Sequence, residues 1–132
     1  DIKNEYDTLC KNKQKYYFHD LDPWFEYNQK YYYYKIHDFP KLYAFLKTVP
    51  CVNHAMIAVM EGSMSIPAHR AESNLQLRYH LTLEGTSNLT TEFDIHQHKP
   101  GEDVLFDHSR YHGVDKTDKQ KRVVLILDIN RF

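Results

Sequence analysis

Residues 75–84 read LQLRYHLTLE, an unbroken alternation of apolar and polar side chains. A period of two over this length is typical of a β-strand with one face on a core. The apolar face, formed by the leucines and Tyr79, is therefore expected to be buried. The polar face, which carries Arg78 and His80, either meets solvent or lines a pocket inside a small barrel. In the second case a cation and a hydrogen-bond donor would lie side by side.

Beyond Pro50 the sequence keeps a period near two, interrupted by turns at Gly62, Gly85 and Pro100-Gly101. No helical stretch intervenes, which favours an antiparallel sandwich or a small barrel. We expect strands over residues 54–60, 64–68, 75–84, 90–96, 102–107, 110–114 and 121–129.

The last of these strands differs from the others, because residues 123–127 read VVLIL and are apolar on both faces. This pattern predicts a strand that is buried on both sides. Arg122 stands at its entrance. An arginine in that position is either a solvated terminus or, inside a cavity, a fixed fork suited to one carboxylate.

The N-terminal part of the chain lacks a clear period. Residues 1–37 are expected to form an irregular, aromatic-rich wrap around the same domain. A short helix should follow, because Asp38 is a suitable N-cap, Pro40 suits the first turn and Pro50 ends the segment. We therefore expect a short helical and irregular N-terminal segment, followed by a mainly β body over residues 38–132.

Composition excludes several classes of function. The 132 residues contain 17 Lys+Arg and 18 Asp+Glu, so no basic footprint for nucleic acid is present. No apolar run is long enough for a membrane span and no signal peptide is evident, which favours a cytoplasmic location by default. Cys10 and Cys51 fit neither a disulfide scaffold nor a zinc knuckle. The oligomeric state is left open.

Nine histidines are the most distinctive feature of the composition. Metal ligands on a β scaffold must converge in space, which leaves His69, His112 and the His96–His98 pair as candidates. Turn histidines are common, so a structural role is favoured for the His96–His98 pair. Spacing alone also favours a structural role for His69 and His112.

Two segments of the chain carry ordered motifs. Residues 66–81 read IPAHRAESNLQLRYHL, and residues 101–112 read GEDVLFDHSRYH. They resemble the P-x-H-x-G-x-x-N-x-x-L-R-x-H-L and G-x-x-x-x-F-D-x-S-x-x-H blocks of the aspartyl/asparaginyl β-hydroxylase family. Arg122 follows His112 by ten residues and Asp128 closes the strand, as in that family. The resemblance covers roughly residues 38–129.

The resemblance implies a double-stranded β-helix, the cupin-like jelly roll of oxygenases that use Fe(II), 2-oxoglutarate and O2. His69 and His112 would be the iron ligands, and Arg122 would pair with the far carboxylate of 2-oxoglutarate. Arg78 and His80 would hold the co-substrate at its metal-chelating end. These roles agree with the strand pattern, because imidazole nitrogens suit Fe(II) and a planar guanidinium suits a carboxylate.

The function implied by this resemblance is that of a 2-oxoglutarate-dependent dioxygenase that hydroxylates an unactivated C–H bond. The favoured substrate is the β-carbon of Asp or Asn residues in a peptide or protein. Two alternatives are a lipid acyl-chain hydroxylase of the same family and a non-catalytic cupin-like module that binds a carboxylate. A zinc hydrolase is disfavoured, because no general base is evident near the two histidines.

The chain departs from the family pattern at a few positions. Ala71 stands where most related oxygenases carry a carboxylate ligand, and the β-hydroxylase family tends to have glycine there. Water would then complete the metal shell, and weaker metal retention is expected. Ala58 falls where some relatives have a serine that supports the co-substrate carboxylate. Residues 129–132 replace the usual tail after Asp128.

Overall fold

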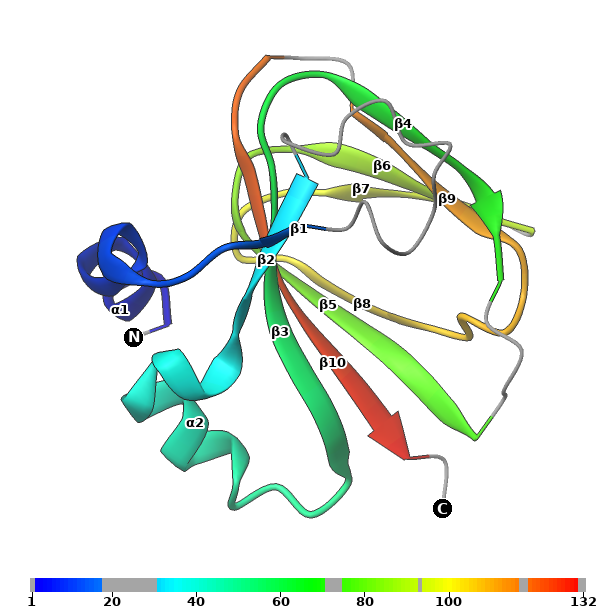
Figure 1. Cartoon of the computed structure of the whole chain (residues 1–132). Helices are drawn as coiled ribbons and strands as arrows, with labels where there is room; N and C mark the ends of the chain where they lie inside the picture. The colour runs from blue at the N-terminus through cyan, green and yellow to red at the C-terminus, as the bar shows by residue number, and fades with distance from the viewer. Residues whose placement is uncertain (1, 18–30, 71–74, 93, 117–118, 131–132) are drawn as a thin grey trace.

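The computed structural model of the protein describes residues 2–17, 31–70, 75–92, 94–116 and 119–130. Two antiparallel β-sheets face each other in this part of the chain, and the helices α1 and α2 lie together beside the larger sheet (Figure 1). The larger sheet has the order β1-β2-β3-β10-β5-β8, and the smaller sheet has the order β4-β9-β6-β7. The mainly β, two-sheet fold expected from the sequence is therefore confirmed.

The elements follow one another along the chain as α1 (Ile2–Leu9), η1 (Cys10–Asn12), β1 (Tyr16–Tyr17), β2 (Tyr31–Lys35), η3 (Ile36–Asp38), α2 (Pro40–Leu46), β3 (Val52–Met60), β4 (Met64–His69), β5 (Gln76–Glu84), β6 (Ser87–Thr91), β7 (Ile95–His98), β8 (Asp103–Phe106), β9 (His112–Lys116) and β10 (Arg122–Asn130).

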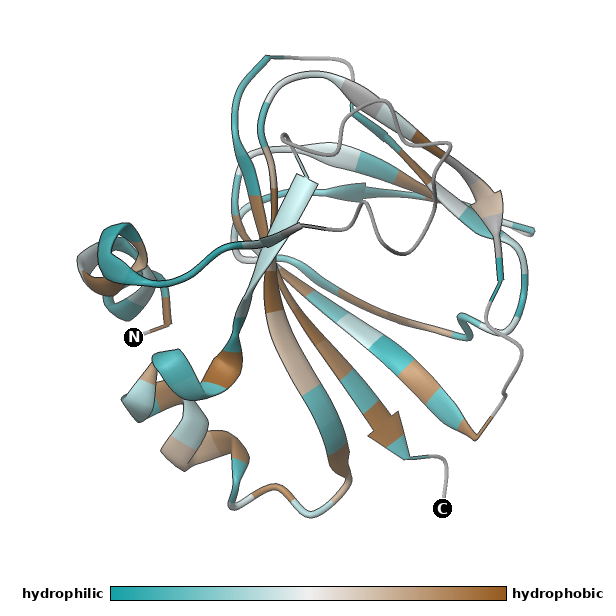
Figure 2. Ribbon diagram, viewed as in Figure 1, coloured by the Kyte–Doolittle hydropathy of each residue, from teal (hydrophilic) through white to brown (hydrophobic). Residues whose placement is uncertain are grey.

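Strand β10 lies at the centre of the larger sheet, between β3 and β5. Its two faces are both buried, as its doubly apolar sequence predicts. Val123 and Leu125 pack with the helices on the outer side of the sheet. Val124 and Ile126 belong to a separate buried cluster on the inner side, which faces the smaller sheet. Figure 2 shows the hydrophobic residues that recur along β3, β10 and β5.

Strand β5 shows the expected alternation, but Leu75 lies before the strand and is 62% exposed, so its expected burial is wrong. Leu83 is buried in the outer core, where Tyr79 and Leu81 also pack. On the other face, His80 and Thr82 are buried as well, so this polar face does not meet solvent. It is turned toward the smaller sheet, because the ring of His80 stacks on His98 of β7. Of the two readings of the polar face, the structure supports the one in which it lines the interior.

The N-terminal residues are more regular than expected. Strand β2 pairs with β3 and extends the larger sheet, and β1 pairs with β2 in turn. Tyr32 and Tyr34 are buried in the outer core, whereas Tyr31 and Tyr33 pack against the inner cluster. A run of one residue type hides this alternation, although tyrosine is well suited to strands. The expectation of an irregular segment is therefore wrong for these residues, while residues 18–30 lie outside the described part.

The predicted helix forms, but Asp38 is not its N-cap. Helix α2 begins at Pro40 after Phe39, and Asp38 lies in the preceding 3-10 turn. The backbone N–H groups of Lys41 and Leu42 instead donate to the carboxylate of Glu5 on α1, at 2.8 and 2.9 Å. A carboxylate at a helix N-terminus satisfies N–H groups that have no partner within the helix. The helix ends at Leu46, before Pro50.

One predicted strand is wrong, because residues 90–96 do not form a single strand. They are divided between β6 and β7, which pair as a hairpin. At the turn, the backbone N–H of Asp94 donates to Oγ1 of Thr91 at 3.1 Å. Threonine suits both strands and turns, so the sequence alone does not reveal the break.

No helix in the described ranges combines the length and apolar character needed to cross a bilayer.

Candidate functional site

Polar side chains gather in the interior between the two sheets, where a domain core is usually apolar. They come from both sheets and have exposed fractions of 5% or less. Burying polar groups at this density is costly unless they are hydrogen-bonded or serve a ligand. The cluster comprises His80 and Thr82 of β5, Arg122 of β10, Ser87 of β6 and His98 of β7.

Burial of Arg122 costs more free energy than burial of the other members of this cluster, because its side chain is charged and its exposed fraction is only 1%. Its Nη1 donates to Oγ of Ser87 at 3.2 Å, and its Nε has no hydrogen-bond partner among the described residues. Burial lowers the pKa of its guanidinium. No carboxylate of the described ranges forms an ion pair with it. A buried guanidinium without a counter-charge indicates a place for an anion.

His80 lies at the centre of the site and bonds to the smaller sheet. Its Nδ1 is 3.2 Å from Nε2 of His98, and Nδ1 of His98 is 2.8 Å from Oγ of Ser87. Burial is the main cause that lowers the pKa of both imidazoles, to about 3 for His98. Both rings are therefore neutral near pH 7. Nε2 of His80 has no partner within the described ranges.

His112 begins strand β9 and is buried. Its Nδ1 is 2.9 Å from the backbone carbonyl of Arg110. A carbonyl oxygen can only accept, so Nδ1 carries a proton, and in the neutral ring Nε2 then carries the lone pair. The ring of Phe106 contacts both His80 and His112, with centroid distances of 4.9 Å and 5.2 Å.

The pairing of β4 with β9 places His69 opposite His112. They are direct partners in the ladder between β4 and β9. The register shifts between Ile66 and His69, so that a bulge separates these two paired positions. Residues opposite each other on antiparallel strands have Cβ atoms about 5 Å apart. No group of three or more His, Cys, Asp or Glu suited to a metal occurs among the described residues, and Ala71 lies outside them.

Arg78 lies toward the opposite end of β5 from Thr82, where the strand pairs with Asp128 of β10. Its Nε donates to Oδ1 of that carboxylate at 3.0 Å. The positive charges of Arg78 and Arg122 both act on His80, as does His112. The structure therefore brings Arg78, Arg122 and His112 around His80, and it engages Arg78 in an ion pair that the sequence did not reveal.

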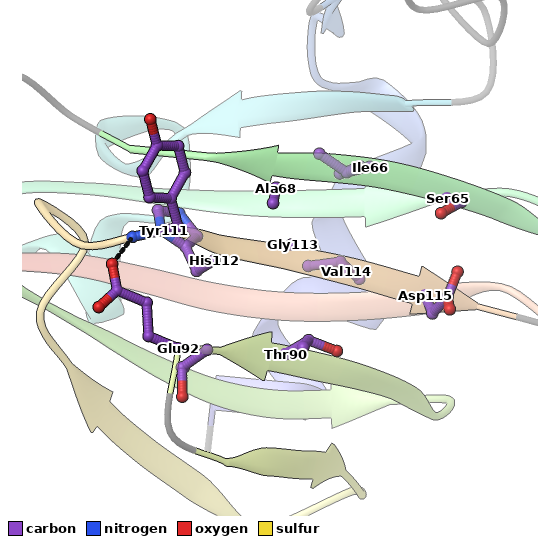
Figure 3. A pocket seen from close by; sticks show the side chains of 11 residues that line it. Ser65, Ile66, Ala68, Thr90, Glu92, Tyr111, His112, Gly113, Val114 and Asp115 are labelled. Carbon is purple, nitrogen blue, oxygen red and sulfur yellow. Dashed lines mark hydrogen bonds between the residues drawn. The ribbon is translucent and has the colours of Figure 1, made fainter.

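A pocket of about 390 Å³ lies beside His112, over β4, β9 and β6 (Figure 3). Its lining includes Ser65, Thr90 and Asp115, so it is partly polar. At its rim, Glu92 accepts a hydrogen bond from the backbone N–H of Tyr111 at 3.1 Å. Ser65, Thr90 and Asp115 are exposed positions of their strands, so the polar part of the lining faces solvent. The rim also carries a cation–π contact, in which Arg70 stacks on Tyr111 at 5.5 Å, and an ion pair of 3.5 Å between Arg110 and Glu92.

Sequence reasoning missed three residues of the interior. His98 was expected to be a turn histidine, and Ser87 and Tyr31 carried no motif. The alternation of β7 places His96 and His98 on one face, which was a usable signal for His98. Nothing in the sequence indicated that Ser87 would contact both His98 and Arg122. Tyr31 packs against the inner cluster and interacts electrostatically with Arg122.

Comparison with solved structures defines the class of fold as cupin-like. The polyketide cyclase RemF from Streptomyces resistomycificus aligns with a TM-score of 0.61 and 14% identity, covering 92% of this chain and 82% of that one. The cupin domain of Cnp3 from Schizosaccharomyces pombe aligns with a TM-score of 0.52 and 13% identity, covering 62% of this chain and 58% of that one. The DMSP lyase DddQ from Ruegeria pomeroyi DSS-3 aligns with a TM-score of 0.51 and 18% identity, covering 60% of this chain and 39% of that one. At these identities the likeness concerns the fold alone.

The sequence model of the aspartyl/asparaginyl β-hydroxylase family matches residues 1–131, and the chain belongs to this family. Its members are typically hydroxylases that depend on Fe(II) and 2-oxoglutarate. No curated protein matches the sequence significantly. The chain spans only 39% and 58% of the DddQ and Cnp3 chains that it resembles in fold.

Proposed function

We propose that the protein is an Fe(II)- and 2-oxoglutarate-dependent dioxygenase that hydroxylates the β-carbon of Asp or Asn residues in a peptide or protein. The observation that carries this proposal is the buried guanidinium of Arg122, which has no carboxylate partner among the described residues. Charge-assisted, two-pronged hydrogen bonds make such a group suited to a carboxylate. The distal carboxylate of 2-oxoglutarate would supply the missing counter-charge.

The donors of the interior fit a dicarboxylate. Among the buried atoms that lack a hydrogen-bond partner within the described ranges are Nε of Arg122, Nε2 of His80 and Oγ1 of Thr82. They lie on two neighbouring strands, because β10 pairs with β5. A ligand with an acceptor at each end would relieve the cost of leaving such atoms unsatisfied. Arg78 would assist His80 by its charge, while Asp128 fixes the direction of its side chain.

The proposed iron ligands are His69 and His112. His112 suits the role because its Nδ1 donates to the Arg110 carbonyl, as the second ring nitrogen of a metal-binding histidine usually does. The direct pairing of His69 with His112 supports a shared site. When bound there, Fe(II) would supply the activation of O2 that hydroxylation of a C–H bond requires. The chain's own contribution is to fix the ligand tautomer, neutralise the co-substrate and keep the interior dry.

The two candidate substrate classes make different demands on the surface beside His112. The pocket there is lined by polar groups such as Glu92 and Thr91, which suit a peptide with polar side chains. A markedly apolar pocket, of about 280 Å³, lies between α2 and the outer face of the larger sheet. That face is opposite the one that carries His80 and Arg122. An acyl chain bound there would not reach the proposed iron, which favours the peptide.

A metal titration under anaerobic conditions tests the proposed ligands. Fe(II) should bind to the wild type and should fail to bind to His69→Ala and His112→Ala. The His96→Gln variant is the matched control, because His96 is half-buried beside His98 but has no proposed ligand role. Unchanged Fe(II) binding by both alanine variants would overturn the assignment.

Incubation of the iron-loaded protein with candidate substrates tests the substrate class. Asp- and Asn-containing peptides should show a mass increase of one oxygen atom, whereas oxidation of acyl lipids alone would transfer the proposal to the lipid class.

A further inference from the structure

Behind His80 lies a continuous chain of hydrogen bonds that ends at Arg122. It runs from Arg122 to Ser87 at 3.2 Å, from Ser87 to His98 at 2.8 Å and from His98 to His80 at 3.2 Å. All four residues have exposed fractions of 5% or less. We propose that Ser87 and His98 are positioning residues that hold the proton of His80 on Nε2, and so make His80 a hydrogen-bond donor toward the co-substrate.

The direction of this chain follows from its first link. A guanidinium can only donate, so Oγ of Ser87 accepts from Nη1 of Arg122. The hydroxyl proton of Ser87 then needs an acceptor, and within the described ranges its only other partner is Nδ1 of His98. Leaving a buried hydroxyl proton unsatisfied would be unfavourable. Ser87 therefore donates to His98, and Nδ1 of His98 is unprotonated.

The second link carries the same direction to His80. With Nδ1 unprotonated, neutral His98 has its proton on Nε2, which faces Nδ1 of His80 at 3.2 Å. Nδ1 of His80 accepts this bond, so the proton of His80 lies on Nε2. This is the atom that has no partner among the described residues. The two ring planes are 27° apart and their centroids are 5.4 Å apart.

His80 and His112, whose rings both contact Phe106, therefore carry opposite tautomers. His112 donates from Nδ1 to the Arg110 carbonyl and keeps its lone pair on Nε2, as a metal ligand requires. In His80 the lone pair is on Nδ1, where it accepts the hydrogen bond from His98. The remaining nitrogen, Nε2, carries a proton, so His80 can donate a hydrogen bond but cannot bind a metal. In each ring, the hydrogen-bond partner of Nδ1 thereby determines whether Nε2 donates a proton or offers a lone pair. This inference rests on the proposed function in so far as the acceptor is 2-oxoglutarate.

Nitrogen chemical shifts of the imidazoles test the relay directly, because they distinguish the two neutral tautomers without any turnover. In protein labelled with ¹⁵N-histidine, His80 and His98 should both be protonated at Nε2. Ser87→Ala removes the hydroxyl that fixes His98 and should give a mixture of tautomers at both residues. Ser87→Thr, which keeps the hydroxyl, should restore the single tautomer, and His96→Gln on β7 should leave it unchanged. A proton on Nδ1 of His80 in the wild type, or no change in Ser87→Ala, would overturn the proposal.

Calorimetric titration with 2-oxoglutarate, in the presence of Mn(II) as a redox-stable metal, separates this proposal from the proposed function. Ser87→Ala should bind 2-oxoglutarate roughly two- to ten-fold more weakly, because only part of the population presents the donor. Equal affinity of the wild type and Ser87→Ala would contradict the relay while leaving the co-substrate assignment intact. Absence of binding to the wild type would contradict the co-substrate assignment, and the nitrogen shifts would still decide the relay.

Discussion

His98 of the smaller sheet stacks on His80 of the larger sheet with ring centroids 5.4 Å apart and with its Nε2 3.2 Å from Nδ1 of His80. This contact joins the two sheets through polar atoms at a depth where most sandwiches use apolar ones. The candidate site is therefore complete only when the sheets are packed. Changes that alter the sheet packing should affect ligand binding and stability together, whereas changes confined to the ligand-facing donors should separate them.

Arg122→Met should separate stability from binding. Removing a buried charge without a counter-ion should leave the metal-free protein within about 1 kcal/mol of the wild type, or more stable. The same change should weaken binding of 2-oxoglutarate by at least about 100-fold, because it removes the charge-assisted bonds to a carboxylate. Urea unfolding and calorimetric titration measure the two effects. Exposed Lys99→Met is the control, and similar losses of affinity in both variants would contradict the role of Arg122.

The stability of the metal-free protein should fall as the solution is acidified. Burial lowers the pKa of both His80 and His98 in the folded protein, to about 3 for His98, whereas the unfolded chain takes up these protons near the ordinary value of 6.5. The unfolded state therefore binds more protons below that value. The lowered pKa of His98 should cost about 2 kcal/mol of unfolding free energy between about pH 8 and about pH 5, and His80 should add a loss in the same direction.

His98→Phe checks the source of this pH dependence. The variant keeps an aromatic ring against His80 but has no titrating group, so its loss of stability over the same pH range should be smaller by about 2 kcal/mol. Urea unfolding of the two proteins at both pH values gives the comparison. Identical pH dependence in the wild type and His98→Phe would show that His98 is not held neutral by burial.

Gly85→Ala should disturb the entrance of β10 and the position of Arg122. Gly85 has φ +77°, and an added Cβ would contact the backbone oxygen of Lys121 and lie 2.8 Å from Cα of Arg122. We expect a loss of more than about 3 kcal/mol in unfolding free energy. Gly101→Ala is the matched control, because its φ is +85° but nothing lies within 4 Å of the added atom. It should cost about 1 kcal/mol, and equal losses in the two variants would contradict the steric argument.

Glu5 should stabilise α2 more than Asp38 does. Glu5→Ala removes the acceptor for the N–H groups of Lys41 and Leu42 and should cost about 1 kcal/mol in unfolding free energy. Asp38→Ala should cost less than about 0.5 kcal/mol, because Asp38 makes no capping hydrogen bond to this helix. Thermal unfolding of both variants decides the matter, and the reverse order would reinstate Asp38 as the cap.

The parts of the fold that could be predicted are those where a local pattern has one physical meaning. The doubly apolar stretch of β10 specifies two buried faces, and both were confirmed. The alternation of β5 indicated one core face, where Leu81 and Leu83 pack, but left open whether the polar face is buried as well. Strand β2 was missed because its alternating faces carry the same residue, so that only the pairing with β3 distinguishes Tyr31 from Tyr32. The N-cap was missed because Glu5 lies on another helix, at a sequence distance that no local signal spans.

The candidate site divides in the same way. Arg78, His80, His112 and Arg122 follow from ordered motifs, and these four gather around the interior face of the larger sheet. Ser87 and His98 belong to the smaller sheet and acquire a role only when the two sheets face each other. Their contribution depends on tertiary packing, which strand periodicity does not report. The ion pair of Arg78 with Asp128 likewise depends on the register between β5 and β10.

Succinate formation from 2-oxoglutarate is the most direct test of the proposed activity. The wild type, supplied with Fe(II), O2 and an Asp- or Asn-containing peptide, should release succinate in proportion to hydroxylated peptide. His112→Ala and Arg122→Met should both reduce this release to the background of protein-free controls, the first through loss of metal and the second through loss of co-substrate. Succinate release by the wild type no greater than that of His112→Ala would contradict the assignment of the protein as a 2-oxoglutarate-dependent hydroxylase.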